Sequence, residues 1–346
     1  MGFTGDLQIM LTVKLLGNGR VKVVQVSRPE AGKGWVVIKT KASGICGSTL
    51  HSYFSTEERK KSTTGHEVAG EVFEVGDEVS GLKLKDRVAI NGVVSCGMCK
   101  FCRRGNWVFC KEARSIGGDL AGGDAEYLAV PEKNCFLLPC DLSFEQGALL
   151  GDAVGTPYRA IKRLGINGTH TVALFGSGPV GLGALLILKL LNCKILVVEI
   201  SKYRQEMSKS LGADVVIDPN EQDVTSAIKE YTGGEGVDVA IDCAGKEMTE
   251  NQALDCVRKG GKVAFVGENK AATIRPSDQF IRKELTVIGS WYYNVGEYQE
   301  LIALMRRGLN VERIITHRFK LEEAQKAFSI FASGKSGKVI FVPDNP

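Results

Sequence analysis

Cysteines gather in one short stretch of the sequence. Cys96, Cys99 and Cys102 recur at intervals of three residues, and Cys110 follows eight residues later. Four thiolates at this spacing can close a tetrahedral sulfur site within a single loop, which is typical of structural zinc. An iron–sulfur cluster also takes four cysteines and is the competing interpretation. Lys, Arg and Gly between the cysteines argue against four unrelated buried thiols. We therefore predict a structural zinc ion at this loop.

A second group of chemically capable residues is spread over two segments. Cys46, Ser48 and His51 lie in a glycine-flanked segment, and His66 and Glu67 follow some twenty residues after Cys46. Thiolate, imidazole and carboxylate are the ligands of catalytic zinc sites, which keep one coordination position open. A thiol nucleophile with a histidine base is the alternative for Cys46 and His66. Spacing alone does not pair these two residues.

A glycine-rich turn between two apolar runs indicates a dinucleotide site. The apolar run Thr171–Phe175 predicts a buried strand, and a G-x-G-x-x-G motif follows it. Such glycines permit a tight turn, close approach of the backbone to a pyrophosphate, and close packing of the next helix. That helix, expected over residues 182–191, would direct its free N–H groups at the phosphates. The turn supplies the candidate cofactor-binding residues Gly176, Gly178, Pro179, Val180 and Gly181.

An acidic residue ends the second apolar run of this unit. The strand expected over Lys194–Val198 is followed by Glu199, about twenty residues after the glycines, where a carboxylate can accept hydrogen bonds from a ribose diol. A carboxylate there favours NAD and repels the 2′-phosphate of NADP. Arg204, five residues on, is the cation that could weaken this preference. We therefore predict NAD, with NADP as the less favoured cofactor.

The elements that must position these residues differ between two parts of the chain. Residues 1–150 are rich in short strand-like runs separated by Gly, Pro and Asp, at 21–26, 34–39, 68–75, 87–90 and 125–130. From Ala153 onward helical and strand patterns alternate, which predicts a parallel sheet with helices on both faces. We expect helices over 153–164, 182–191, 202–211, 224–231, 248–257 and 297–307, and strands over 171–175, 194–198, 214–217, 237–242, 262–266, 285–289 and 338–342.

Composition excludes several classes of protein. The 346 residues are 44% apolar and 24% charged, as in a soluble globular protein of two domains. A net charge of +4 without long Lys/Arg runs gives no reason to expect nucleic acid. No apolar segment reaches the ~18 residues that would span a membrane. The first residues lack the pattern of a signal peptide, so we expect a cytoplasmic protein whose clustered cysteines bind metal.

Together these motifs resemble the zinc-containing medium-chain dehydrogenase/reductase family, which comprises alcohol and polyol dehydrogenases. The matching segments are GICGSTLH (44–51), GHEVAGEVFEVG (65–76), DRV (86–88), CGMCKFCRRGNWVFC (96–110) and GSGPVG (176–181), so the resemblance covers essentially the whole chain. It implies an α/β protein with a GroES-like, β-rich catalytic domain over 1–152, a doubly wound Rossmann domain over 153–290, and a return to the catalytic domain over 291–346.

The resemblance also implies a set of site residues. A catalytic zinc would be held by Cys46, His66 and a third ligand at Asp152, with Glu67 beside the metal or moving onto it; Asp152 also suits a helix N-cap. Thr49 stands where many relatives have an Asp that orients the histidine. Each chain would then carry one catalytic and one structural zinc ion. Further cofactor contacts are expected at Val266, Ser290 and Lys338.

The implied reaction is hydride transfer between an alcohol, whether primary, secondary or a polyol, and NAD, giving an aldehyde or ketone. Ser48 would take the alcohol proton and pass it through the nicotinamide ribose to His51. A sugar or polyol dehydrogenase, a zinc-free quinone reductase and a non-catalytic NAD-binding protein are the alternatives, and the metal ligands argue against the last two. We expect a small alcohol or carbonyl compound as substrate, and a homo-oligomer, either dimer or tetramer.

Overall fold

The structure is a computed structural model that describes residues 8–56 and 63–343. The chain forms two compact units. The first contains the residues up to Asp152, the segment His317–Ala332 and the residues from Val339 onward. The second contains Ala153–Thr316 and the short segment Ser333–Lys338. Each unit has its own sheet and its own buried core.

The second unit continues past residue 290, where we expected the Rossmann domain to end and the return over 291–346 to begin. Helix α8 (Tyr298–Arg306) still belongs to it and packs against α3 (Gly155–Leu164). A buried ion pair supports this packing, since Arg159 Nη1 lies 3.2 Å from Glu297 Oε2. The chain therefore first leaves the second unit within β16 (Ile315–Phe319).

A seven-stranded sheet forms the centre of the first unit, with strand order β16-β17-β3-β4-β5-β9 and with β8 also paired to β3. The strands besides β16 are β3 (Trp35–Gly44), β4 (Glu67–Val75), β5 (Arg87–Ile90), β8 (Tyr127–Pro131), β9 (Cys135–Leu137) and β17 (Lys338–Phe341). Strand β3 pairs antiparallel with β4, β8 and β17. Its last residue, Gly44, lies opposite Glu67 at the start of β4. This register brings together the segments that carry Cys46 and His66.

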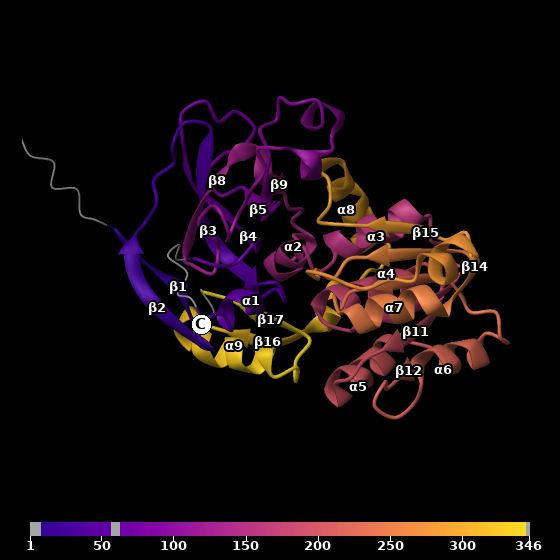
Figure 1. Cartoon of the computed structure of the whole chain (residues 1–346). Coiled ribbons are helices and arrows are strands. Elements are labelled where there is room, and N and C mark those ends of the chain that lie inside the picture. The colour runs from indigo at the N-terminus through magenta and orange to yellow at the C-terminus, as the bar shows by residue number, and fades with distance from the viewer. Residues whose placement is uncertain (1–7, 57–62, 344–346) are drawn as a thin grey trace, which may run out of the picture. The chain divides into compact units, whose positions relative to one another are not determined.

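Smaller elements surround this sheet. A hairpin of β1 (Ile9–Gly17) and β2 (Arg20–Ser27), of which the sequence predicts only the second strand, packs against the C-terminal helix α9 (Ala324–Ala332), drawn in yellow in Figure 1. Side chains from both ends of the chain, including Val13, Tyr53 and Phe328, fill this core. The other elements are α1 (Thr49–Tyr53), α2 (Phe144–Leu150), β6 (Val93–Val94), β7 (Arg114–Ser115), η1 (Cys102–Arg104), η2 (Trp107–Phe109), η3 (Glu132–Asn134) and η7 (Leu321–Glu323).

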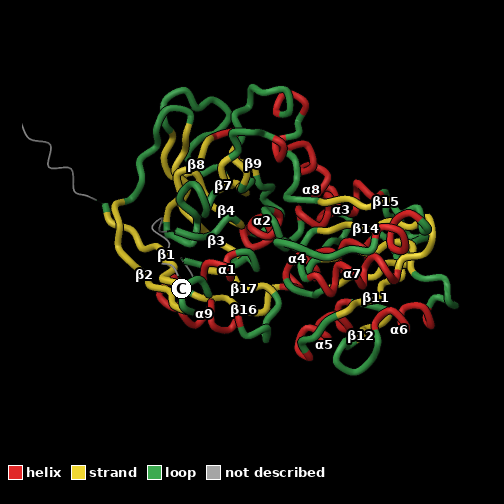
Figure 2. The backbone as a smooth tube through the Cα atoms, in the orientation of Figure 1, coloured by secondary structure: helices red, strands yellow, loops and turns green. Residues whose placement is uncertain are grey.

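The second unit is built on a six-stranded sheet in the order β12-β11-β10-β13-β14-β15, with every neighbouring pair parallel. This order is that of the Rossmann fold, so the predicted fold class is confirmed. Its strands are β10 (Thr171–Phe175), β11 (Lys194–Val198), β12 (Val215–Ile217), β13 (Val237–Asp242), β14 (Val257–Phe265) and β15 (Thr286–Gly289). Figure 2 shows the alternation of red helices and yellow strands in this part of the chain.

Local capping explains where several helices of this unit begin. The Ser201 side chain accepts from the Arg204 N–H at the start of α5 (Lys202–Leu211), and the Asp223 side chain accepts from the Ser226 N–H at the start of α6 (Val224–Tyr231). Helix α4 is apolar on nearly all sides and is almost wholly buried. The remaining elements are α4 (Pro179–Leu190), α5 (Lys202–Leu211), α6 (Val224–Tyr231), α7 (Glu247–Cys256), η4 (Pro276–Ile281), η5 (Val295–Glu297) and η6 (Val311–Ile314).

Among the residues that the structure describes, we find no helix with both the length and the apolar character needed to cross a lipid bilayer.

The Lys283 side chain caps the C-terminal end of α7. Lys283 Nζ donates to three backbone carbonyls at 2.8, 2.8 and 3.0 Å, those of Leu254, Asp255 and Val257. Carbonyls at a helix end lack intrahelical partners and attract a cation. Burial lowers the pKa of Lys283, and the Asp255 carboxylate opposes this effect. The ammonium group therefore joins α7 to the segment that leads into β15.

Replacing Lys283 by methionine keeps an unbranched apolar stem and removes these three contacts. We expect the free energy of unfolding to fall by about 1–3 kcal/mol, as for other charged hydrogen bonds, in urea denaturation followed by circular dichroism. Lys209→Met in α5 is the matched control, because that side chain is 55% exposed and its ion pair with Glu206 contributes little. Equal stability of Lys283→Met and the parent protein would contradict the capping role.

Candidate metal centres and dinucleotide site

Four ligand-type side chains of the first unit converge on one small volume. One ligand atom from each of Cys46, His66, Glu67 and Asp152 lies within 4.8 Å of the others. Cys46 Sγ is 3.0 Å from Asp152 Oδ2, and His66 Nε2 is 3.1 Å from the same oxygen. Three of these residues are buried, and His66 is nearly so. The structure thus brings together the residues that the family resemblance implies as one set.

Sheet register and helix packing create this convergence. Cys46 follows β3, and His66 immediately precedes Glu67, the first residue of β4. Asp152 follows α2, which packs on the sheet through Ala148 against alanines of β3 and β4. At Gly151 an added Cβ would lie only 3.2 Å from the Cα of Glu67, so the chain after α2 passes directly over the start of β4. Asp152 is therefore placed by tertiary packing.

The electrostatics of this set favour a bound cation. Burial and then the Asp152 carboxylate raise the pKa of the Cys46 thiol. Burial alone would lower the pKa of His66, but Cys46 and Asp152 outweigh it, and the pKa of the imidazole is raised. Negative charge on the thiol and carboxylates would otherwise accumulate where water screens poorly. A divalent cation relieves this by binding the deprotonated groups. Sulfur, nitrogen and carboxylate donors in one cluster fit zinc.

Ser48 and His51, which follow Cys46 in the sequence, are also predicted as site residues. Ser48 Oγ donates to Cys46 Sγ at 3.4 Å, and the residue is exposed. His51 lies in the short helix α1, also exposed, with its backbone N–H 3.4 Å from the Ser48 carbonyl. Both residues can therefore reach solvent, and Ser48 contacts the proposed ligand set directly.

The four-cysteine loop forms a second set. The ligand sulfurs of Cys96, Cys99, Cys102 and Cys110 all lie within 4.8 Å of one another, and none is in a disulfide. The sulfur of Cys102 lies 3.4 Å from that of Cys99 and 3.9 Å from that of Cys96. Zn–S bonds of ~2.3 Å in a tetrahedron place sulfurs roughly 3.8 Å apart. These distances fit one zinc ion better than an iron–sulfur cluster, which would separate its ligands more widely.

Backbone N–H groups support thiolates in this loop. The N–H of Cys99 donates to Cys96 Sγ at 3.3 Å, and the N–H of Cys96 donates to Cys110 Sγ at the same distance. Hydrogen bonds from Cys99 and Met98 lower the pKa of Cys96 to about 7, whereas burial raises the pKa of Cys102 to about 11. A metal ion would keep all four sulfurs deprotonated.

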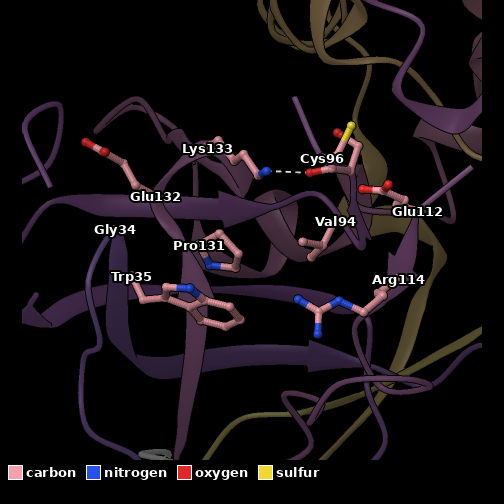
Figure 3. Close-up of a pocket in the computed structure, with 10 residues that line it drawn as sticks. Gly34, Trp35, Val94, Cys96, Glu112, Arg114, Pro131, Glu132 and Lys133 are labelled. Carbon is pink, nitrogen blue, oxygen red and sulfur yellow. Dashed lines mark hydrogen bonds between the residues drawn. The ribbon is translucent and has the colours of Figure 1, made fainter. Parts of the chain in front are cut away.

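A pocket of about 620 Å³ adjoins the four-cysteine loop (Figure 3). Figure 3 shows the Arg114 guanidinium extending toward the Trp35 ring, with Glu112 near Cys96. The Lys133 ammonium donates to the carbonyl of Ser95, and both residues line the pocket. Among the described residues, those that line this pocket include no member of the Cys46 set, which is Cys46, His66, Glu67 and Asp152. The pocket therefore belongs to the cysteine loop and its neighbouring strands.

The glycine motif of the second unit has the geometry of a phosphate-binding turn. Gly176 follows β10 with φ +83°, a conformation that a side chain would strain. A Cβ at Gly181 would lie 1.9 Å from the Gly176 carbonyl oxygen, so only glycine fits there. Helix α4 begins within the motif, with Gly178 as N-cap and Pro179 at its first turn, and not at residue 182 as predicted. The helix start and its free N–H groups thus lie at the turn itself.

Glu199 is held firmly beside this turn. The residue is 6% exposed, and its carboxylate accepts the Ser177 N–H at 2.7 Å and the Ser201 N–H at 2.8 Å. Arg204 lies close by, because a Cβ at Gly178 would be 3.9 Å from its Nη1. Burial lowers the pKa of Arg204, and the charge on Glu199 opposes this. Anion and cation therefore both lie at the glycine turn.

The remaining expected cofactor residues lie at strand ends. Val266 follows β14 and donates its N–H to the Asp242 carbonyl at the end of β13. Ser290 follows β15, is buried, and donates its N–H to the Phe265 carbonyl. These two residues therefore meet at the carboxyl edge of the sheet, where ligands of such sheets bind. Lys338 lies in β17, fully buried, and its carbonyl accepts from the Thr316 hydroxyl at 3.4 Å.

Comparison with known proteins covers both units. Residues 32–140 match the alcohol dehydrogenase GroES-like domain, and residues 179–307 match the zinc-binding dehydrogenase family. An L-threonine 3-dehydrogenase from Marinomonas sp. (strain MWYL1) is 32% identical over 334 residues, which are 94% of this chain and 97% of that protein.

Solved structures show the same relationship. The alcohol dehydrogenase from Thermus sp. ATN1 is 30% identical with a TM-score of 0.89, covering 96% of this chain and 99% of that one. A zinc-binding dehydrogenase from Sinorhizobium meliloti 1021, solved bound to NADP, is 30% identical with a TM-score of 0.87, covering 97% and 100%. The predicted family is thereby confirmed: this chain belongs to the zinc-containing medium-chain dehydrogenase/reductase family and is one of its oxidoreductases.

Proposed function

We propose that this protein is a zinc-dependent dehydrogenase that moves a hydride between an alcohol and NAD, giving an aldehyde or ketone. The observation that carries the proposal is the four-residue cluster of Cys46, His66, Glu67 and Asp152 in a chain that also has a phosphate-binding turn. Zinc bound to this cluster would polarise the oxygen of the substrate, and NAD would accept the hydride. A protein that only binds NAD would need no such cluster.

The chain's own residues would move the proton that the alcohol loses. We propose that the Ser48 hydroxyl, which contacts Cys46, accepts this proton. His51 would then deliver it to solvent, since it is exposed and an imidazole can take up and release a proton. Cys46, His66 and Asp152 would orient the substrate oxygen through the metal that they hold, with Glu67, the second carboxylate of the set, beside the metal or moving onto it. The four-cysteine loop would hold a second, structural zinc ion.

Glu199 supports NAD as the cofactor. Two backbone N–H groups hold its carboxylate beside the glycine turn, and a negative charge there would repel a 2′-phosphate. Arg204 is the opposing feature, and the Sinorhizobium relative was solved with NADP. We propose that Glu199 outweighs Arg204, because Arg204 Nε is already engaged by the Ser336 carbonyl at 2.9 Å. Val266, Ser290 and Lys338 remain proposed cofactor contacts.

The proposed substrate class is a small secondary alcohol. The Marinomonas relative is named for L-threonine, whose hydroxyl is on a secondary carbon bonded to the carbon that carries the amine. A panel with NAD should contain L-threonine, simple secondary and primary alcohols, polyols and sugars. Reduction of NAD by none of these alcohols, at any pH between 7 and 10, would contradict the proposed function.

The metal sites are tested by counting zinc. We expect two zinc ions per chain in the parent protein, one after Cys46→Ser and one after the matched variant Cys99→Ser, by plasma mass spectrometry. Cys46→Ser should also lower kcat by about a thousandfold, because the metal supplies several kcal/mol of charge stabilisation. A parent protein with one zinc ion, held by the cysteine loop, would instead indicate a scaffold without the catalytic metal.

Cofactor choice is tested at Glu199. Replacing it by serine removes the charge, so the ratio of kcat/KM for NAD to that for NADP should fall by at least about tenfold. Glu206→Gln is the matched control, since it removes the same charge from a side chain that is 72% exposed on α5. A parent enzyme that prefers NADP at equal concentration would reject the assignment of NAD.

The proton path is tested at His51. His51→Gln should slow turnover near pH 7 by up to about a hundredfold, the lower end of a general base's contribution, with recovery as hydroxide rises. His170→Gln, in the second unit, should leave the pH profile of kcat unchanged. If His51→Gln keeps the full rate throughout the neutral range, His51 is not the end of the path.

A further inference from the structure

One buried carboxylate of the first unit has no place in the proposed chemistry. Asp124 is 1% exposed and lies between Gly123 and Ala125, just before β8. A carboxylate at such a depth costs free energy unless hydrogen bonds satisfy its oxygens. Its position therefore requires partners, and those partners lie on the two segments that carry the proposed zinc ligands.

The two oxygens of Asp124 bind two different segments. Oδ1 accepts the Ser43 hydroxyl at 2.6 Å, and Oδ2 accepts the Thr64 hydroxyl. Ser43 is fully buried near the end of β3, three residues before Cys46. Thr64 is also buried and comes two residues before His66. One carboxylate thus joins the approaches to both ligands.

Backbone contacts reinforce this link on the Thr64 side. The Asp124 N–H donates to the Thr64 carbonyl at 2.7 Å, and the Gly123 N–H donates to the Gly65 carbonyl at 2.9 Å. Gly65 has φ +98°, and a Cβ there would lie 2.4 Å from Asp124 Oδ1. The two segments are therefore in direct van der Waals contact, and the residue before His66 has little freedom to move.

The backbone at Asp124 is also held in place by strand β1. Its carbonyl accepts the Val13 N–H from β1 at 2.9 Å. The neighbouring Ala125 forms a bridge with Thr12 of the same strand. The carboxylate is thus presented from a segment that β1 fixes in place.

The pairing of β3 with β4 stops short of Cys46 and His66. Its last paired residues are Gly44 and Glu67, so Cys46 and His66 both lie just beyond the ladder. We propose that Asp124 is a positioning residue that replaces the missing ladder contacts and fixes the separation of Cys46 from His66. The inference rests on the proposed catalytic zinc site. Groups that orient metal ligands without touching the metal commonly change its affinity by about 10–100-fold.

Zinc release provides a test that does not depend on turnover. The zinc-loaded protein is mixed with excess chromophoric chelator, and the two zinc ions are followed as separate phases, assigned with Cys46→Ser and Cys99→Ser. In Asp124→Asn one oxygen acceptor becomes an amide donor that faces a hydroxyl. We expect the Cys46-set zinc to leave about 10–100-fold faster, with release from the four-cysteine loop unchanged.

Two further variants separate positioning from general destabilisation. Asp119→Asn is the matched control, because Asp119 also accepts a serine hydroxyl and lies nearby in sequence, and both release rates should match the parent. Ser43→Ala touches neither His66 nor its loop and acts through Asp124, so it should accelerate the same phase. With cobalt in place of zinc, the d–d absorption bands of Asp124→Asn should shift while thiolate charge-transfer bands of the cysteine loop persist.

The zinc count of the parent protein separates failure of the proposed function from failure of the role proposed for Asp124. A parent protein that binds only one zinc ion overturns the catalytic site and this inference with it. Two zinc ions in the parent, with release unchanged in folded Asp124→Asn, overturn the inference alone. If Asp124→Asn does not fold, Ser43→Ala decides, and an unchanged release phase in that variant rejects the positioning role.

Discussion

The concentration of ionisable groups in one buried volume is the constraint on which the first unit depends. Cys46, Glu67 and Asp152 share a site with His66. Burial and then the Asp152 carboxylate raise the pKa of the Cys46 thiol, and Cys46 and Asp152 raise the pKa of the His66 imidazole against the effect of burial. Without a cation this arrangement is electrostatically unfavourable, so surrounding structure must hold it together. The β3–β4 register, the close passage of the chain after α2 and the buried Asp124 each serve that end. The stability of the unit and its affinity for metal are therefore coupled.

In the second unit, the main constraint is the fixed position of one charged side chain, Glu199, beside the glycine turn. Glu199 keeps both carboxylate oxygens occupied by N–H groups from Ser177 and Ser201, which border the glycine turn and α5. Its orientation is thus set before any cofactor arrives, and such preorganisation lowers the cost of binding. Arg204 is restrained in the same way by the Ser336 carbonyl. In the proposed cofactor site, the balance between these opposite charges, more than either one, would decide between NAD and NADP.

Sequence predicted the second unit well because its strands are continuous apolar runs, and such runs are typical of strands buried on both faces. Boundaries were less accurate: β14 begins at Val257, five residues before the predicted start, because Gly260 and Gly261 interrupt its apolar pattern. The hairpin strand β1 and helix α9 were missed, since each buries its apolar face only against the other end of the chain. Helix α9 does carry a local signal, because its buried residues Ala324, Ala327, Phe328 and Phe331 recur at helical spacing.

Some candidate-site residues could likewise be predicted from local sequence, and others could not. The cysteine loop and the glycine turn could be predicted from local spacing, because each is a single segment with fixed chemistry. Asp152 could be proposed only from the family resemblance, since it is brought to Cys46 from 106 residues away by the packing of α2. Asp124 gave no signal beyond an acidic residue after two glycines in an apolar run. Its partners, Ser43 and Thr64, are recognisable only once the strands are paired.

The ligands of the two proposed metal sites are separated by very different distances along the sequence, and this difference bears on the order in which the sites form during synthesis. The sulfurs of Cys96 and Cys110 come from one segment and meet across a separation of 14 residues. Local loops of this size close quickly, so the cysteine loop can capture a metal while the chain is still leaving the ribosome. The Cys46 set needs the assembled sheet and α2 before its ligands meet. If both proposed sites bind zinc, metallation is thus expected to be sequential, with the ion of the cysteine loop bound before the ion of the Cys46 set.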